Sequence, residues 1–154
     1  MGQSQSKKGR AVGINHVAIE VGDVSAAIDF YGRFLEFQVE EQNDEMAIIY
    51  FGDQFINFIR NADRKPDQMR HFGIAVDDKG LVRRTLDEMG VKLLDSRFLD
   101  FLDPWGNRVE ITTYTSIQYT KADHILEGMG LAYLKKSDEA IAELRAKGMA
   151  PDGN

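Results

Sequence analysis

The chain contains no cysteine, and this absence removes several kinds of chemistry at once. Without cysteine there are no disulfides, no thiolate metal ligands and no cysteine nucleophile. A chain without thiols fits a reducing compartment, so we expect a cytoplasmic protein. No apolar run approaches the ~20 residues that a membrane-spanning helix needs. The first ten residues, MGQSQSKKGR, also lack the apolar stretch of a secretory signal.

Acidic residues outnumber basic ones, and a long basic run is also missing. The chain has 19 basic and 25 acidic residues, a formal net charge of −6, and no long basic run. We therefore expect neither a nucleic-acid partner nor a membrane partner. The 154 residues, 43% of them apolar and 29% charged, are typical of a globular domain that buries its own core.

Alternating and helical patterns in the first half of the chain predict one helix among short strands. Residues 14–21 alternate and are rich in β-branched side chains, which predicts a strand. Residues 24–35 carry apolar side chains at helical spacing, with Asp23 or Ser25 as the N-cap. Three further strands are predicted in this half, at 37–41, 46–51 and 54–60. Gly52 lies in a plausible tight turn between the last two of them.

The same order of elements returns after a polar linker at 61–68. A strand is predicted at 70–76 and a helix at 80–89, with Gly90 in the position of a C-terminal cap. Further strands are predicted at 92–95, 97–102 and 108–115.

These two halves form an internal repeat. When His16 is placed on His71, the segment NHVAIEVGD lies over RHFGIAVDD without a gap, at a spacing of 55 residues (71 minus 16). Each half has the order βαβββ. Two such units must bury their apolar faces together, so we expect an α+β fold. In this fold both modules contribute to a curved, cup-like mixed sheet with the helices outside.

The segment after the repeat, from residue 116 onward, has a different pattern. Residues 121–128 and 137–148 have helical character, and Ser137 is suited to an N-cap. We expect this tail to pack on the domain or on a partner subunit. The expected organisation therefore has three parts. They are a disordered leader at 1–12, a domain at 13–115 with modules 13–61 and 69–115, and a helical C-terminal extension at 116–154.

Two histidines occupy equivalent points of the repeat. His16 is in phase with Ala18 and Glu20 on its strand, and His71 holds the matching place in the second half. A single histidine on a strand is more often a structural residue than a ligand. A pair at equivalent positions is harder to explain in that way, because a pseudo-twofold arrangement would bring the two rings together across the axis.

Glu110 lies on the last predicted strand, where Val109 and Ile111 point to the opposite face. If those two face the helices, Glu110 faces the concave side, where a metal would offset the cost of enclosing a carboxylate. A solvated strand face is the competing interpretation. Two histidines and one carboxylate form a known ligand set for Fe(II), and they also suit Mn, Zn or Ni. We therefore predict a site for one divalent metal ion, with open positions for water or substrate.

These motifs resemble the vicinal oxygen chelate superfamily. This group includes glyoxalase I, extradiol dioxygenases, methylmalonyl-CoA epimerase, and the fosfomycin- and bleomycin-resistance proteins. The match covers about residues 13–115. The segments that carry it are 15–19, 27–31, 71–76 and the run FLDPWGNRVEI at 101–111. The resemblance implies paired βαβββ modules around a metal-binding cup, with His16, His71 and Glu110 as ligands.

Two positions depart from the pattern of that superfamily. Its fourth ligand position corresponds to Asn57, where glyoxalase I has glutamate or glutamine. Asn57 is therefore a candidate fourth ligand, either of the metal or of a metal-bound water. Many ring-cleaving dioxygenases and fosfomycin enzymes have a tyrosine ten residues before the ligand glutamate, and here that position is Asp100. Asp100 is a candidate catalytic base, and a solvated side chain at the rim is the alternative.

The resemblance implies an enzyme that acts on a small-molecule substrate chelating the metal through vicinal oxygens. The two-histidine, one-glutamate set favours a dioxygenase. A glyoxalase- or epimerase-like lyase or isomerase is one alternative. A ligand-sequestering protein of the bleomycin-resistance kind, which needs no metal, is another, although retention of all three ligand types argues against it. The resemblance also implies a homodimer, and the sequence leaves open whether one site draws on one chain or two.

Overall fold

The computed structural model describes residues 16–52 and 54–150. The leader predicted at 1–12 lies outside the described residues. No helix in the described part of the chain is long and apolar enough to cross a bilayer.

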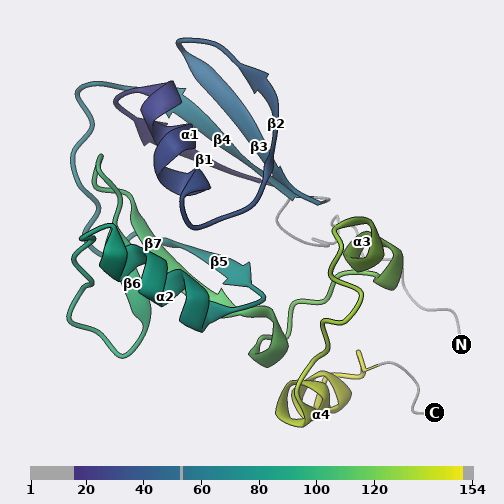
Figure 1. Ribbon diagram of the computed structural model, residues 1–154. Helices are drawn as coiled ribbons and strands as arrows, with labels where there is room; N and C mark the ends of the chain where they lie inside the picture. Colours follow the sequence, from purple (N-terminus) through teal and green to yellow (C-terminus); the bar gives the residue numbers. More distant parts are fainter. Residues whose placement is uncertain (1–15, 53, 151–154) are drawn as a thin grey trace, which may run out of the picture.

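The fold is α+β, with helices packed on two small mixed sheets (Figure 1). The first half of the chain forms β1 (His16–Val21), α1 (Val24–Gly32), β2 (Gln38–Gln42), β3 (Met46–Phe51) and β4 (Gln54–Arg60). The second half forms β5 (Phe72–Val76), α2 (Lys79–Glu88), β6 (Leu99–Leu102) and β7 (Arg108–Thr113). The tail forms a short 3-10 helix, η1 (Tyr114–Ser116), followed by α3 (Asp123–Gly128) and α4 (Asp138–Ala146).

The three strands of the second sheet repeat the order and directions of β1, β4 and β3 in the first, which confirms the repeat. The first sheet has the order β1-β4-β3-β2, and the second has the order β5-β7-β6. In each sheet the first strand of the module pairs in parallel with the last strand, while the other pairings are antiparallel. The helix after the first strand makes this parallel return possible.

The second module differs from the prediction in its strands. The segment predicted as a strand at 92–95 forms only an isolated bridge between Leu93 and Phe101. The next strand begins at Leu99 rather than at 97. The hydroxyl of Ser96 accepts from the Phe98 amide at 3.0 Å, and this local turn takes backbone groups that a longer ladder would use.

The predicted caps are present where the sequence placed them. Asp23 accepts from the Ala26 amide at 2.7 Å and starts α1, and Ser137 accepts from the Ala140 amide at 3.2 Å and starts α4. Gly90 follows α2 with a φ of 70°, a left-handed conformation that favours glycine at a helix end.

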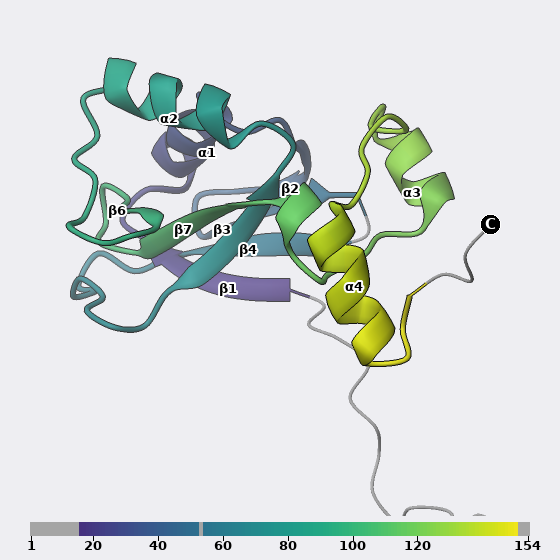
Figure 2. The ribbon, with the colours of Figure 1, turned by 90° about the horizontal axis from the view of Figure 1, so that it is seen from below.

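The two helices of the repeat lie on the same side of the sheets, which leaves the opposite face open (Figure 2). One apolar core runs between helices and sheets and draws on both modules. The ring of Phe101 in the second module packs on Phe30 of α1 and on Phe34, which follows α1, with centroid distances of 6.3 and 5.7 Å. The hydroxyl of Tyr31 donates to Asp103 at 2.9 Å, which adds a buried polar link between the modules.

The tail contacts both modules through two tyrosine hydroxyls. Tyr119 donates to Gln54 of β4 at 2.7 Å, and Tyr133 donates to Asp77, which precedes α2, at 2.8 Å. A second small core lies under the tail, and its members are Tyr114, Leu126, Leu134 and Leu131.

Candidate metal centre

The open face of the sheets is defined by the alternation of burial along each strand. On β7, Val109 and Ile111 are fully buried toward the helices, while Glu110 is only partly buried. This is the orientation that the sequence predicted for Glu110. On β1, His16, Ala18 and Glu20 are exposed and alternate with more buried residues. Both predicted histidines and the glutamate therefore have access to solvent.

His71 and Glu110 lie together. The Nε2 atom of His71 is 3.9 Å from the Oε2 atom of Glu110, with side-chain exposures of 47% and 25%. The Nδ1 atom of His71 lies 2.9 Å from the carbonyl oxygen of Met69. A carbonyl can only accept, so Nδ1 carries the proton and a neutral ring keeps its lone pair on Nε2. A hydrogen bond of this kind, from the far nitrogen to a carbonyl, is typical of metal-ligating histidines.

His16 occupies a different part of the open face. Its ring stacks on Phe55, the residue paired with it on β4, with centroids 4.6 Å apart and planes within 9°. Figures 1 and 2 show β1 and β5 running in opposite directions, so the equivalent starts of the two strands are not adjacent. Among residues 16–52 and 54–150, no three His, Asp, Glu or Cys side chains lie close enough to hold one metal ion. The single chain thus brings together two of the three predicted ligands.

Asn57 lies on β4 between Ala18 of β1 and Ile48 of β3, on the same face as Phe55. In the amide orientation that satisfies its neighbours, Nδ2 donates to the carbonyls of Ala47 at 3.1 Å and Phe58 at 3.3 Å. These bonds fix the side chain against its own sheet. Its role as a fourth ligand, or as a holder of water, remains a prediction.

Asp100 is fully buried, which differs from the solvated rim position considered above. Its Oδ2 atom accepts from Nε and Nη2 of Arg108 at 2.9 and 2.5 Å, and its Oδ1 atom accepts from the Ser96 hydroxyl at 2.5 Å. Burial raises the pKa of Asp100, but the bonds from Ser96 and Arg108 and the charge of Arg108 outweigh burial and lower the pKa overall. The role of Asp100 as a base remains a prediction, and these contacts count against it.

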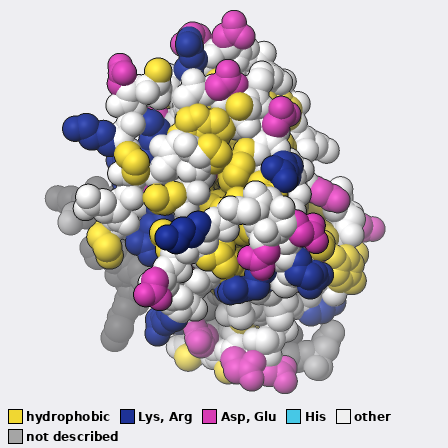
Figure 3. All heavy atoms as spheres, turned by 60° about the vertical axis from the view of Figure 1, so that its left-hand side comes forward, with side chains coloured by type: hydrophobic (Ala, Val, Ile, Leu, Met, Phe, Trp, Pro, Cys, Tyr) yellow, Lys and Arg dark blue, Asp and Glu magenta, His cyan; other side chains and the backbone are white. Residues whose placement is uncertain are grey.

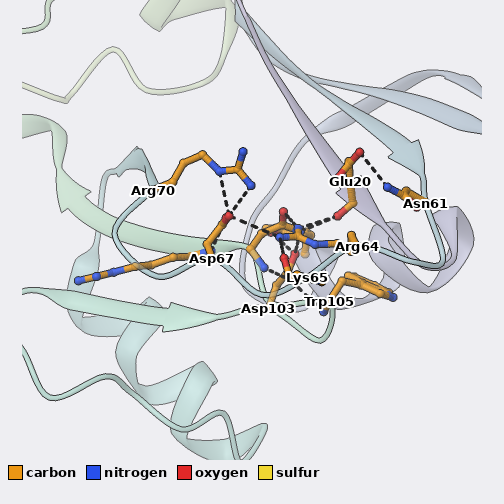
Figure 4. Close-up of polar contacts among 11 residues, drawn as sticks. Glu20, Asn61, Arg64, Lys65, Asp67, Arg70, Asp103 and Trp105 are labelled. Carbon is orange, nitrogen blue, oxygen red and sulfur yellow. Dashed lines mark hydrogen bonds and ion pairs between the residues drawn. The ribbon is translucent and has the colours of Figure 1, made fainter.

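The segment before His71 is tied to the rest of the molecule by arginines (Figure 4). Arg64 donates to the carbonyl of Glu20 at 3.0 Å and also to the side chain of Asn107. Asp67 accepts from Nε and Nη2 of Arg70 at 2.9 and 2.7 Å. These contacts hold the linker between β1 and the turn that leads into β7. They therefore fix the position of His71, which follows the linker.

Two shallow hollows lie away from the candidate ligands. One of about 440 Å³ is lined by Phe30, Val91, Lys92, Leu94, Leu102 and Pro104. The other, of about 460 Å³, lies between residues of the linker 61–66 and the turn 102–106. Figure 3 shows apolar side chains gathered along the middle of one face of the molecule and bordered by acidic and basic ones. Neither hollow includes His16, His71 or Glu110.

Three contacts of the candidate site were not anticipated from the sequence. They are the stacking of Phe55 on His16, the bond from His71 to Met69, and the pairing of Asp100 with Arg108. The first and third follow from strand register, which a single sequence does not show. The alternation that put Arg108 on the face of Glu110 was visible, but its partner on β6 was not.

Comparison with known proteins places this fold and these strands in one family. Residues 13–111 match the model of the Glyoxalase/Bleomycin resistance protein/Dioxygenase superfamily. The metallothiol transferase FosB of Staphylococcus saprophyticus is 25% identical over 116 residues, which cover 66% of this chain and 77% of that protein.

Solved structures agree on the fold. A possible glyoxalase from Bacillus cereus has a TM-score of 0.58 and 17% identity, and the match covers 66% of this chain and 99% of that one. Lactoylglutathione lyase from Agrobacterium tumefaciens has a TM-score of 0.55 and 17% identity, with 69% and 96% of the chains covered. With a matched segment that includes both histidines and the glutamate, the chain belongs to the Glyoxalase/Bleomycin resistance protein/Dioxygenase superfamily.

Proposed function

We propose that this chain is a divalent-metal-dependent enzyme whose small substrate chelates the metal through vicinal oxygens. The observation that carries the proposal is that Nε2 of His71 lies 3.9 Å from Oε2 of Glu110, while Nδ1 of His71 donates to the Met69 carbonyl. An imidazole nitrogen and a carboxylate oxygen are donors that Fe, Mn, Zn and Ni accept. The residues present therefore fit a divalent cation in donor type.

We propose His16 as the third ligand, supplied by a second copy of the chain. Within one chain His16 is not grouped with His71 and Glu110 in the described part of the molecule. Both histidines are nonetheless exposed on the open face, where a partner could meet them. A closed twofold dimer would form two equivalent sites, each with His16 of one copy and His71 and Glu110 of the other.

The chemistry that the metal would supply is polarisation of a bound oxygen and stabilisation of the negative charge that develops on the substrate. Glu110 and the histidines would hold the cation with positions left open toward the sheet face. The concave positions of β5 beside them, Gly73 and Ala75, carry almost no side chain and leave room for a substrate. Phe55 would keep the ring of His16 in a fixed plane.

Among reactions, the two-histidine, one-glutamate set favours a dioxygenase acting with Fe(II). A thiol transferase is a second candidate, favoured by the similarity to metallothiol transferase FosB over 116 residues. A glyoxalase- or epimerase-like lyase or isomerase is a further candidate, but this chain has Asn57 where glyoxalase I has glutamate or glutamine.

A panel of reactions tests the proposal. Metal-free protein is reconstituted separately with Fe(II), Mn(II), Zn(II) and Ni(II). Oxygen uptake with catechols, loss of free thiol with electrophilic acceptors, and turnover of a hemithioacetal are then measured. We expect one metal to support one reaction, and Glu110→Gln to abolish it. Equal rates in the wild type and Glu110→Gln, with every metal, would contradict the proposal.

A further inference from the structure

Arg108 and Glu110 share the open face of β7, two residues apart. Two strand residues span ~6.6 Å, so a long arginine side chain can reach a carboxylate at that separation. An ion pair between them would neutralise the oxygen that the proposed metal needs. In the described residues, however, Glu110 lies beside His71, and Arg108 forms its ion pair with Asp100.

Asp100 lies directly opposite Glu110 in the β6–β7 register. Like charges at opposite positions of a sheet repel, so an unpaired Asp100 would be unfavourable there. Arg108 removes this problem with two bonds to one oxygen of Asp100, and Ser96 bonds to the other oxygen. Arg108 also donates from Nη1 to the Gln68 carbonyl at 2.9 Å. All three nitrogens of its guanidinium thus donate to groups other than Glu110.

We infer that Asp100 is a positioning residue that holds Arg108 away from Glu110 and so keeps the Glu110 carboxylate available to a cation. This inference rests on the proposed function and deepens it. The side chain of Asp100 is 1% exposed and that of Arg108 is 19% exposed, so water screens this pair little. Their separation of 2.5 Å makes it a close, charge-assisted contact. The arrangement gives Asp100 a role at the site without contact with substrate.

The first test needs no metal. A crystal structure of metal-free Asp100→Asn should show the Arg108 guanidinium within about 4 Å of Glu110, because the amide that replaces the carboxylate carries no charge to retain the guanidinium. If Arg108 keeps its bond to Gln68 and stays away from Glu110, the inference is wrong. This result stands whether or not the wild type binds metal, so it separates failure of the inference from failure of the proposed function.

The second test measures affinity for Zn(II) and Mn(II) by calorimetry. Asp100→Asn should weaken binding roughly 10- to 100-fold, the usual effect of losing a residue that supports a ligand. The double variant Asp100→Asn/Arg108→Gln removes both buried charges, so it should fold and should recover affinity to within about threefold of the wild type. A double variant as weak as Asp100→Asn would overturn the inference, as would an unchanged affinity in Asp100→Asn.

Discussion

Tyr31 makes a buried polar contact between the two modules. Its ring is fully buried, and its hydroxyl donates to Asp103 in the turn before β7. Burial raises the pKa of Asp103, although bonds from Asn107, Tyr31 and the Trp105 amide oppose that rise. Tyr31 therefore supports a buried acidic group that would otherwise lack one of its donors.

Tyr31→Phe should lower the free energy of unfolding by about 1–3 kcal/mol, the cost of leaving a buried polar group without its partner. Urea denaturation measures this change. Tyr133→Phe is the matched control, because Tyr133 also donates to an aspartate but is 66% exposed. The control should change the free energy by no more than about 0.5 kcal/mol. Equal losses in the two variants would show that the buried bond has no special weight.

At the scale of elements, local patterns in the sequence predicted helix caps and side-chain faces better than they predicted how strands pair and modules pack. The caps at Asp23 and Ser137 and the outward position of Glu110 follow from side-chain chemistry and period, and all are present. The strand predicted at 92–95 was wrong because turn contacts at Ser96 compete with pairing there. The separation of His16 from His71 in one chain depends on how two modules pack, and alternation within a strand carries no information on that.

Lys136 links the segment before α4 to η1 and the residue that follows η1. Its Nζ atom donates to the carbonyls of Tyr114 at 2.5 Å and Ile117 at 2.9 Å, and it lies 3.5 Å from the centre of the Tyr114 ring. Burial lowers the pKa of Lys136 to about 8. The elements of the tail are thus held together through an ammonium group that is costly to enclose.

The stability of the tail should consequently depend on pH. Between about pH 8 and 10 the unfolded state binds more protons at Lys136 than the folded state, so the free energy of unfolding should rise with pH. Lys136→Met should remove that part of the slope, whereas Lys135→Met, at an exposed neighbour, should leave it unchanged. Urea denaturation at about pH 7.5, 8.5 and 9.5 measures the slopes. Identical slopes in the wild type and Lys136→Met would contradict this account.

For the whole molecule, the proposed sharing of sites between two copies can be tested by mixing defective chains. His16→Ala and Glu110→Ala should each fail to bind metal. In a mixed dimer, one site receives His16 from the Glu110→Ala chain and both other ligands from the His16→Ala chain. Co-expression and purification with two different tags should therefore restore about one metal per mixed dimer, as one of its two sites is complete.

A site contained within one chain gives a different result. Every chain of the mixture would then lack one ligand, and the mixed dimer would bind no more metal than either variant alone. Size-exclusion chromatography with light scattering supplies the control, because it shows whether the variants still pair.

The central claim is that His71 and Glu110, together with His16, hold one divalent cation. Calorimetric titration of the metal-free protein with Zn(II) tests it most directly. The account predicts one site per chain in the wild type and roughly 100-fold or greater weakening of binding in both His71→Ala and Glu110→Gln, since each removes a ligand. His124→Ala, which alters an exposed histidine of α3, should bind like the wild type. Wild-type affinity in His71→Ala or Glu110→Gln would contradict the account.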